Sequence, residues 1–232
     1  MTFRFRPLLT AFVAAGLAGL VALGVWQLHR LEWKQALIAR IEARVHAEPI
    51  AFDDALSRIA AGEDMEYQPV QISGRFQPDL QERIFGIYDG AAGAYVFTPL
   101  VSDDHVIYVN RGFAPERVFK EGAVSEPSGR VEATGLLRYP ESPSPPASWF
   151  RPKGQTASGL WFVRDPLRLG AQAGIAPSSY YIDSFATVGP EWPKGGTTRL
   201  DFRNNHFQYA LTWFGLAAAL LGIYVVFSFE RR

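Results

Sequence analysis

The sequence predicts a membrane protein in which two transmembrane helices flank an α+β, mostly antiparallel β (barrel- or sandwich-like) domain outside the cytoplasm. Three features predict this fold class: an uncharged apolar block near each end, helical spacing directly after the first block, and a succession of short strand patterns between the blocks. The 232 residues include 23 basic and 23 acidic side chains. This neutral balance argues against a nucleic-acid partner, which selects a strongly basic face.

Each apolar block is long enough to cross a bilayer. The first covers Pro7–Leu28 and the second covers residues 206–229, and neither contains Asp, Glu, Lys or Arg. A hydrocarbon core of about 30 Å needs roughly 20 such residues. A cleaved signal peptide is the alternative for the first block. Signal peptides, however, have an apolar region of about 7–15 residues that ends at a small-residue cleavage site, whereas this block continues into Trp26 and Gln27.

Basic residues at both chain ends predict the topology. Arg4 and Arg6 precede the first block, and Arg231 and Arg232 follow the second. Short basic flanks stay on the cytoplasmic side, so we expect both termini in the cytoplasm of a bacterium and the main domain in the periplasm, anchored in the inner (plasma) membrane. The predicted divisions are a cytoplasmic N-terminus at 1–6, spans at 7–28 and 206–229, a periplasmic domain at 29–205 and a cytoplasmic C-terminus at 230–232.

The predicted periplasmic domain begins with helices at about 32–62 and continues with strands at about 66–202. EWKQALIARIEARVHA places its apolar residues on one helical face, which predicts that the first membrane helix continues outward. From Glu66 onward, short segments rich in β-branched and aromatic residues are bounded by Gly, Pro, Asp or Ser. Strands in succession indicate an antiparallel sheet that curls into a barrel or sandwich. The predicted strands are YQPVQISGRF, RIFGIYD, AYVFTPLV, HVIYVNRGF, RVEATGLLRY, LWFVRD, SYYIDSF and TTRLDF.

The composition excludes several kinds of catalytic site. Cysteine is absent, which excludes disulfides, thiolate zinc sites, iron–sulfur clusters and cysteine nucleophiles. Neither a GxSxG nor an HExxH motif occurs, and His46 and His105 are isolated in the sequence. We therefore expect a protein that is not an enzyme, with a tethered periplasmic hydrolase as the alternative.

The segment VIYVNRGFAP is unusual because Asn110, Arg111 and Gly112 follow an apolar strand pattern. We interpret Asn-Arg-Gly as a turn in which Gly112 adopts a backbone angle that other residues avoid.

Two further stretches, GVWQLHRLEWK and RNNHFQYALTW, lie at the ends of the predicted spans. Since the two spans run in opposite directions, both stretches are expected at the same depth on the outer face, where they can touch. The alternative is an interfacial aromatic belt with a snorkelling arginine. On continuous helices, one stripe would contain Trp26, Arg30 and Trp33, and another would contain His206, Tyr209, Ala210 and Trp213.

Together these stretches would offer an imidazole, several aromatic rings and the cations Arg30 and Arg203. Such a set suits a flat, lipophilic, acidic metal macrocycle, because histidine is a common axial ligand of haem and arginine pairs with carboxylates such as propionate. A polar residue at the membrane edge is also a functional hypothesis by default. Helical spacing thus predicts Tyr209 and Trp213 as walls of such a pocket and Arg30 as a propionate partner, with His206 as the imidazole that the pocket offers.

Four motifs in order resemble the Surfeit-locus (Surf/Shy) family of cytochrome c oxidase assembly factors, bacterial haem a-binding type. They are GxWQLxRLxWK at Gly24–Lys34, YxPVxISGRF at Tyr67–Phe76, YVNRGFxP at Tyr108–Pro115 and NNHxQYALTWFGLA at Asn204–Ala217. The resemblance extends over nearly the whole chain and includes both predicted spans and the domain between them.

The resemblance implies that the chain binds haem a and helps it to reach oxidase subunit I, with haem a synthase as a further expected partner. The family's haem-linked histidine maps onto His206, where this sequence has Phe207 in place of the more usual leucine. The Trp-Gln pair maps onto Trp26 and Gln27, which we carry over as pocket candidates. His29 is outside the family pattern and is a weaker candidate for a second ligand. The alternative function is a membrane chaperone that stabilises oxidase subunits without binding haem.

Overall fold

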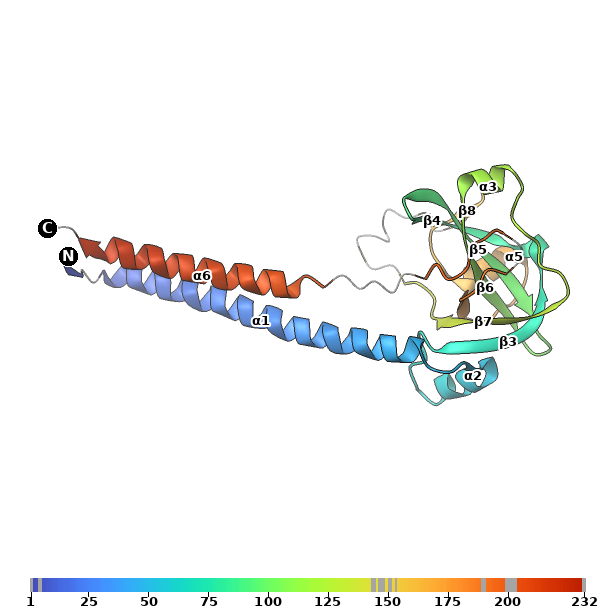
Figure 1. Ribbon diagram of the computed structural model, residues 1–232, viewed down its shortest axis with the longest axis horizontal. Helices are drawn as coiled ribbons and strands as arrows, with labels where there is room; N and C mark the ends of the chain where they lie inside the picture. Colours follow the sequence, from blue (N-terminus) through green and yellow to red (C-terminus); the bar gives the residue numbers. More distant parts are fainter. Residues whose placement is uncertain are drawn as a thin grey trace. The chain divides into compact units, whose positions relative to one another are not determined.

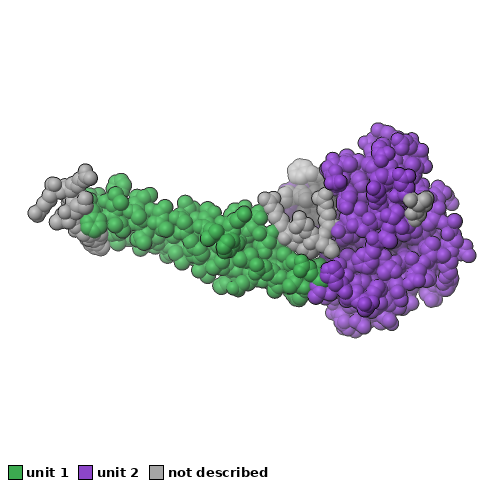
Figure 2. All heavy atoms as spheres, viewed as in Figure 1, with its two compact units in different colours: residues 1–42, 200–232 green, residues 43–199 purple. Residues whose placement is uncertain are grey.

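The computed structural model describes residues 2–3, 6–142, 145, 149, 152, 154–188, 191–198 and 204–230. The chain divides into two compact units, which are coloured separately in Figure 2: residues 1–42 with 200–232, and residues 43–199. We call the first unit the helix pair and the second the sheet domain.

The helix pair consists of two helices that are long and apolar enough to cross a membrane. Helix α1 is a single helix over Pro7–Val45, and α6 covers His206–Ser228. The first predicted span, 7–28, lies within α1, and the second, 206–229, matches α6 except for Phe229, which belongs to β10. The predicted continuation of the first helix beyond residue 28 is confirmed by the length of α1. Within this unit the two helices run side by side in opposite directions, with both chain ends at the same end of the pair (Figure 1). There, β1 (Thr2–Phe3) pairs antiparallel with β10 (Phe229–Glu230).

Small side chains on the facing sides of α1 and α6 let the two helices approach closely. Gly24 of α1 is buried, and so are Ala210 and Ala217 of α6. A Cβ atom placed on Gly24 would lie 2.6 Å from Cε1 of Phe214. Most other side chains of both helices are exposed, as expected for surfaces that face lipid, where helix association depends on close packing of small residues.

We expect Gly24→Leu to destabilise the helix pair by about 1–3 kcal/mol, because the new side chain must displace the Phe214 ring. Gly19→Leu is the matched control, since the same substitution in the same helix finds nothing within 4 Å of its Cβ atom. The test is thermal unfolding of the detergent-solubilised chain, and adding Phe214→Ala should restore much of the loss. Equal unfolding temperatures for the two leucine variants would show that this contact does not hold the pair together.

In the described part of the sheet domain, eight strands follow the order β2-β3-β7-β9-β6-β5-β4-β8, with an additional pairing between β3 and β5. Because of that pairing, β3, β7, β9, β6 and β5 form a closed ring, which confirms the barrel-like interpretation. The pairing is mostly antiparallel, and β2–β3, β4–β8 and β6–β9 are parallel. The strands are β2 (Ile50–Ala51), β3 (Pro69–Phe76), β4 (Glu82–Tyr88), β5 (Ala91–Val101), β6 (Val106–Pro115), β7 (Arg130–Arg138), β8 (Leu160–Trp161) and β9 (Tyr181–Ser184).

In β6 and β9, successive side chains alternate between two apolar cores, as the period of a strand requires. In β6, Ile107 and Val109 belong to one core, and Tyr108 belongs to the other. Helix α2 (Phe52–Ala60) contributes to the first core and α5 (Pro166–Ala173) to the second. The described residues also form the 3-10 helix η1 (Pro78–Leu80) and the helix α3 (Glu116–Lys120).

The predicted turn at Asn110–Gly112 is wrong, because these residues lie inside strand β6. The pairing of β5 with β6 shifts between Tyr95 and Phe97, which leaves one extra residue on β6, the arrangement of a β-bulge. The expectation for the glycine itself is confirmed: Gly112 has a φ of 121°.

The predicted last strand, TTRLDF, lies largely outside the described residues. Thr197 and Thr198, which are described, are not in a strand.

Candidate functional site

The residue predicted as a haem ligand, His206, is the first residue of α6. Its ring nitrogen Nδ1 lies 2.7 Å from Oε1 of Gln27, which comes from α1 and is separated from it by 179 positions in the sequence. Both side chains are half-buried. Within the helix pair, the two stretches singled out from the sequence therefore do meet, and they meet through these two residues.

Contacts along the helix pair set the register that brings Gln27 to His206. Near the chain ends, the hydroxyl oxygens of Thr10 and Tyr224 lie 2.7 Å apart. Further along, Gly24 lies against the ring of Phe214. Position numbers rise along α1 as they fall along α6, so the first residue of α6 lies opposite residue 27 of α1. The contact is thus part of the continuous seam between the helices.

The other predicted pocket residues differ in their exposure. Trp26 and Tyr209 are 52% and 55% exposed, whereas Trp213 is half-buried. The guanidinium carbon of Arg30 lies 4.3 Å from the centre of the Trp33 ring, which is a cation–π contact. His29 is exposed, and Arg203 is outside the described residues. Trp26 and Tyr209 therefore offer open aromatic surfaces, while the Arg30 cation lies over an aromatic ring on its own helix.

A histidine with one nitrogen hydrogen-bonded to an oxygen is suited to bind a metal through the other nitrogen. Among the described residues, no hydrogen bond is made to Nε2 of His206, and no group of three or more His, Asp or Glu side chains could hold a metal ion. His206 could thus supply one imidazole nitrogen to a metal, beside the exposed rings of Trp26 and Tyr209. Such a site fits a flat macrocycle that brings its own equatorial ligands.

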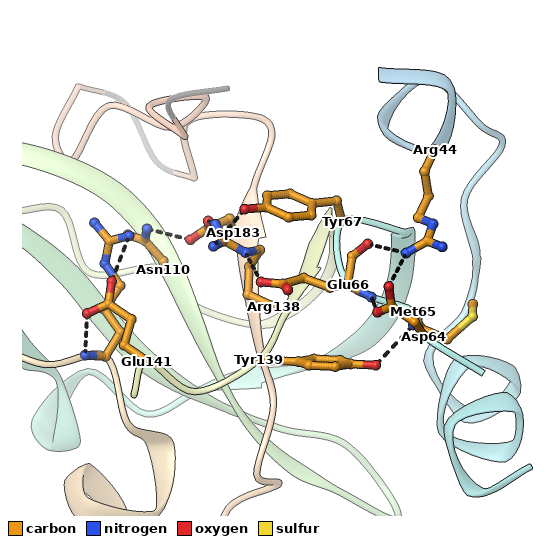
Figure 3. Close-up of polar contacts among 11 residues, drawn as sticks. Arg44, Asp64, Met65, Glu66, Tyr67, Asn110, Arg138, Tyr139, Glu141 and Asp183 are labelled. Atoms are coloured by element: carbon orange, nitrogen blue, oxygen red, sulfur yellow. Dashed lines mark hydrogen bonds and ion pairs between the residues drawn. The ribbon is translucent and has the colours of Figure 1, made fainter. Parts of the chain in front are cut away.

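The sheet domain has a second cluster of polar side chains, which was not predicted as a site although Tyr67 and Asn110 lie in two of the quoted motifs (Figure 3). Its centre is Arg138, whose guanidinium lies 2.9 Å from Asp183 Oδ2 and 3.5 Å from Glu66 Oε1. Asn110 Nδ2 donates a hydrogen bond of 2.7 Å to the other Asp183 oxygen. Arg138 also lies over the Tyr67 ring, 4.4 Å from its centre.

A polar cavity of about 160 Å³ adjoins this cluster and is lined in part by Arg138, Arg164 and Asp183. Arg164 forms an ion pair of 3.5 Å with Glu141, so each arginine faces a carboxylate. Burial opposes the charge of Arg138, but the neighbouring Tyr181 and Asp183 outweigh it and raise the pKa of Arg138. Both arginines of the cluster are thus compensated by carboxylates. We assign the cluster a structural role in joining β6, β7, β9 and the segment that precedes β3.

Arg111, from the VIYVNRGFAP stretch, is also structural. Its side chain is fully buried, and Nη2 donates hydrogen bonds to the backbone oxygens of Ser125 and Val188, at 2.7 and 3.0 Å. Burial lowers the pKa of Arg111 to about 10, so the side chain stays protonated at neutral pH. It connects the bulge in β6 to two loops.

Comparisons with known proteins agree with the motif resemblance. The SURF1 family pattern matches residues 14–218, a range that includes α1 from Ala14 onward, the whole sheet domain and the first half of α6. Surfeit locus protein 1 of Rattus norvegicus is 34% identical over 220 residues, which cover 85% of this chain and 68% of the rat protein. The human Surfeit locus protein 1 is 33% identical over 221 residues, covering 85% and 70%. The SURF1-like protein of Drosophila melanogaster is 30% identical over 222 residues, covering 85% and 70%. The chain therefore belongs to the SURF1 family, the Surfeit-locus family of cytochrome c oxidase assembly factors.

Proposed function

We propose that this chain binds haem a at the outer edge of a bacterial inner membrane and helps to deliver it to subunit I of a haem–copper oxidase. Membership of the SURF1 family supports the broader role in cytochrome c oxidase assembly. The observation that carries the haem proposal is the contact between His206 and Gln27. It combines a histidine at the start of a candidate membrane helix with the Trp-Gln stretch of the other helix.

In this proposal haem a is the cargo, and the chain holds it without turnover. His206 binds the iron axially through Nε2. Trp26, Tyr209 and Trp213 offer aromatic surface to the macrocycle, which favours binding because large rings bury much apolar area. Arg30 is the cation available for a propionate, and reaching it requires Arg30 to leave the Trp33 ring. The function is therefore transfer rather than catalysis.

The proposed location follows from the two apolar helices and the basic chain ends. Both helices cross the membrane, both termini lie in the cytoplasm, and the sheet domain lies in the periplasm. Haem a synthase, which supplies the cargo, and oxidase subunit I, which receives it, are the proposed partners. Both are expected in the same membrane, because haem a is too apolar to travel through water.

Complementation tests the proposed delivery. A bacterial strain that lacks its own SURF1-family gene would receive the wild-type chain, His206→Ala or the control His46→Ala, and the haem a content and activity of its purified oxidase would be measured. We expect His206→Ala to lower both by about tenfold or more, as for loss of a metal-binding group, and His46→Ala to leave them unchanged. A normal oxidase from the His206→Ala strain would instead favour a chaperone that does not bind haem.

A further inference from the structure

We propose that Gln27 is the positioning residue of this site, and that it holds His206 in the tautomer whose proton is on Nδ1 and whose lone pair is on Nε2. This inference builds on the proposed haem site, but its central statement concerns the protein without haem and can be tested there. It assigns Gln27 a role distinct from contact with the macrocycle.

The two atoms in contact determine which of them carries the proton. Nδ1 of His206 lies 2.7 Å from Oε1 of Gln27, and an amide oxygen can only accept a hydrogen bond. The ring nitrogen must therefore carry the proton and donate it. In a neutral imidazole only one nitrogen carries a proton, so Nε2 has the free lone pair that a metal needs.

An acceptor at position 27 matters because an isolated histidine in water prefers the opposite tautomer, with its proton on Nε2. That form cannot bind iron through Nε2. A hydrogen-bond acceptor at Nδ1 corrects the preference and also fixes the ring orientation, as partners of metal-binding histidines commonly do. The acceptor comes from α1, whereas the histidine belongs to α6, so the ligand is prepared only when the two helices are paired.

The environment strengthens this effect. Both side chains are half-buried in the seam between the helices, and a hydrogen bond is stronger in such surroundings than in bulk water. Gln208, in contrast, is exposed on the first turn of α6. It provides a glutamine at similar depth for a matched control.

The first experiment determines the tautomer in the full-length, haem-free chain. The four histidines would be labelled with ¹⁵N and studied by NMR in detergent or nanodiscs, with His206→Ala used to assign the His206 signals. We expect a protonated Nδ1 and an unprotonated Nε2. A proton on Nε2, which would mean that the Gln27 amide donates to the ring through its nitrogen, would overturn the inference whether or not the chain binds haem.

Two variants extend this test. Gln27→Glu keeps an oxygen acceptor and should retain the Nδ1 proton, whereas Gln27→Met keeps a similar length but removes the acceptor and should shift the proton to Nε2. Gln208→Met should change neither signal. An unchanged tautomer in Gln27→Met would show that another group sets it.

In the haem-loaded chain the same variants should separate positioning from simple packing. We expect Gln27→Met to weaken haem a binding by about 10–100-fold, the usual effect of removing a partner of a metal ligand, and to lower the iron–histidine stretching frequency in the resonance Raman spectrum. Gln27→Glu should bind haem a as the wild type does. It should raise that frequency above the wild-type value, because a carboxylate gives the imidazole more anionic character. Wild-type affinity and frequency in Gln27→Met would contradict the inference, whereas a wild-type chain that never binds haem would contradict only the proposed function.

Discussion

Gly112→Ala should be among the most damaging single substitutions in the sheet domain, with an expected loss of about 4 kcal/mol or more of unfolding free energy. The added Cβ atom would lie 1.8 Å from the backbone oxygen of Lys194 and 2.2 Å from its carbonyl carbon. Moving that oxygen away would break the 2.9 Å hydrogen bond that it accepts from the Phe113 amide. The φ of 121° at Gly112 adds strain for any residue with a side chain.

Gly90→Ala separates the clash from the backbone strain. Gly90 also has a positive φ, of 74°, but an added Cβ atom at this position would find nothing within 4 Å. It should therefore lose only about 1–2 kcal/mol, the cost of a left-handed conformation for an L-residue. Denaturant unfolding followed by tryptophan fluorescence would measure both variants in the full-length chain. If Gly112→Ala loses no more unfolding free energy than Gly90→Ala, the Lys194 backbone can move to make room for the Cβ atom.

Arg138→Met should cost about 3–5 kcal/mol, the usual consequence of removing one partner of a buried ion pair. The Asp183 side chain is only 2% exposed, and Arg138 is its ion-pair partner at 2.9 Å. Without the guanidinium, the carboxylate would keep the Asn110 hydrogen bond and lose its ion-pair partner. Methionine preserves much of the length and volume of the arginine stem, so the variant removes mainly the charge.

Arg130→Met is the matched control, because Arg130 pairs with Asp103 at 2.9 Å while both side chains are more than half exposed. Such surface pairs contribute about 0–1 kcal/mol. Adding Asp183→Asn to Arg138→Met should recover part of the loss by removing the unpaired charge. The same unfolding measurement decides the matter, and comparable losses for Arg138→Met and Arg130→Met would refute the assigned structural role.

The elements that the sequence predicted best are those with a strong local signal. The apolar blocks and the helical spacing after the first block predicted α1 and α6, and alternating β-branched and aromatic residues predicted the main strands. Gly112 shows the limit of this reasoning. Asn-Arg-Gly favours a turn locally, but pairing with β5 on one side and the Lys194 backbone on the other keeps the segment in a bulged strand.

The candidate site was predictable in part. The stripe containing His206 and the opposite directions of the two spans predicted that the two stretches could touch. Spacing along each helix could not show that Gln27, rather than Trp26 or Arg30, faces the histidine, because the rotation of one helix against the other depends on packing at residues such as Gly24 and Phe214. The ion pair of Arg138 with Asp183 joins positions 45 residues apart. The only sequence signal for it is that both charged residues lie in otherwise apolar strand segments.

The most direct test of haem binding by this chain is the haem a content of the purified full-length protein. The chain would be produced in cells that make haem a, purified in detergent, and its absorption spectrum compared among wild type, His206→Ala and the control His46→Ala. We expect a haem a band in wild type and in His46→Ala, and a band reduced by about tenfold or more in His206→Ala. A band of the same intensity per chain in His206→Ala would contradict the central claim that His206 binds the haem iron.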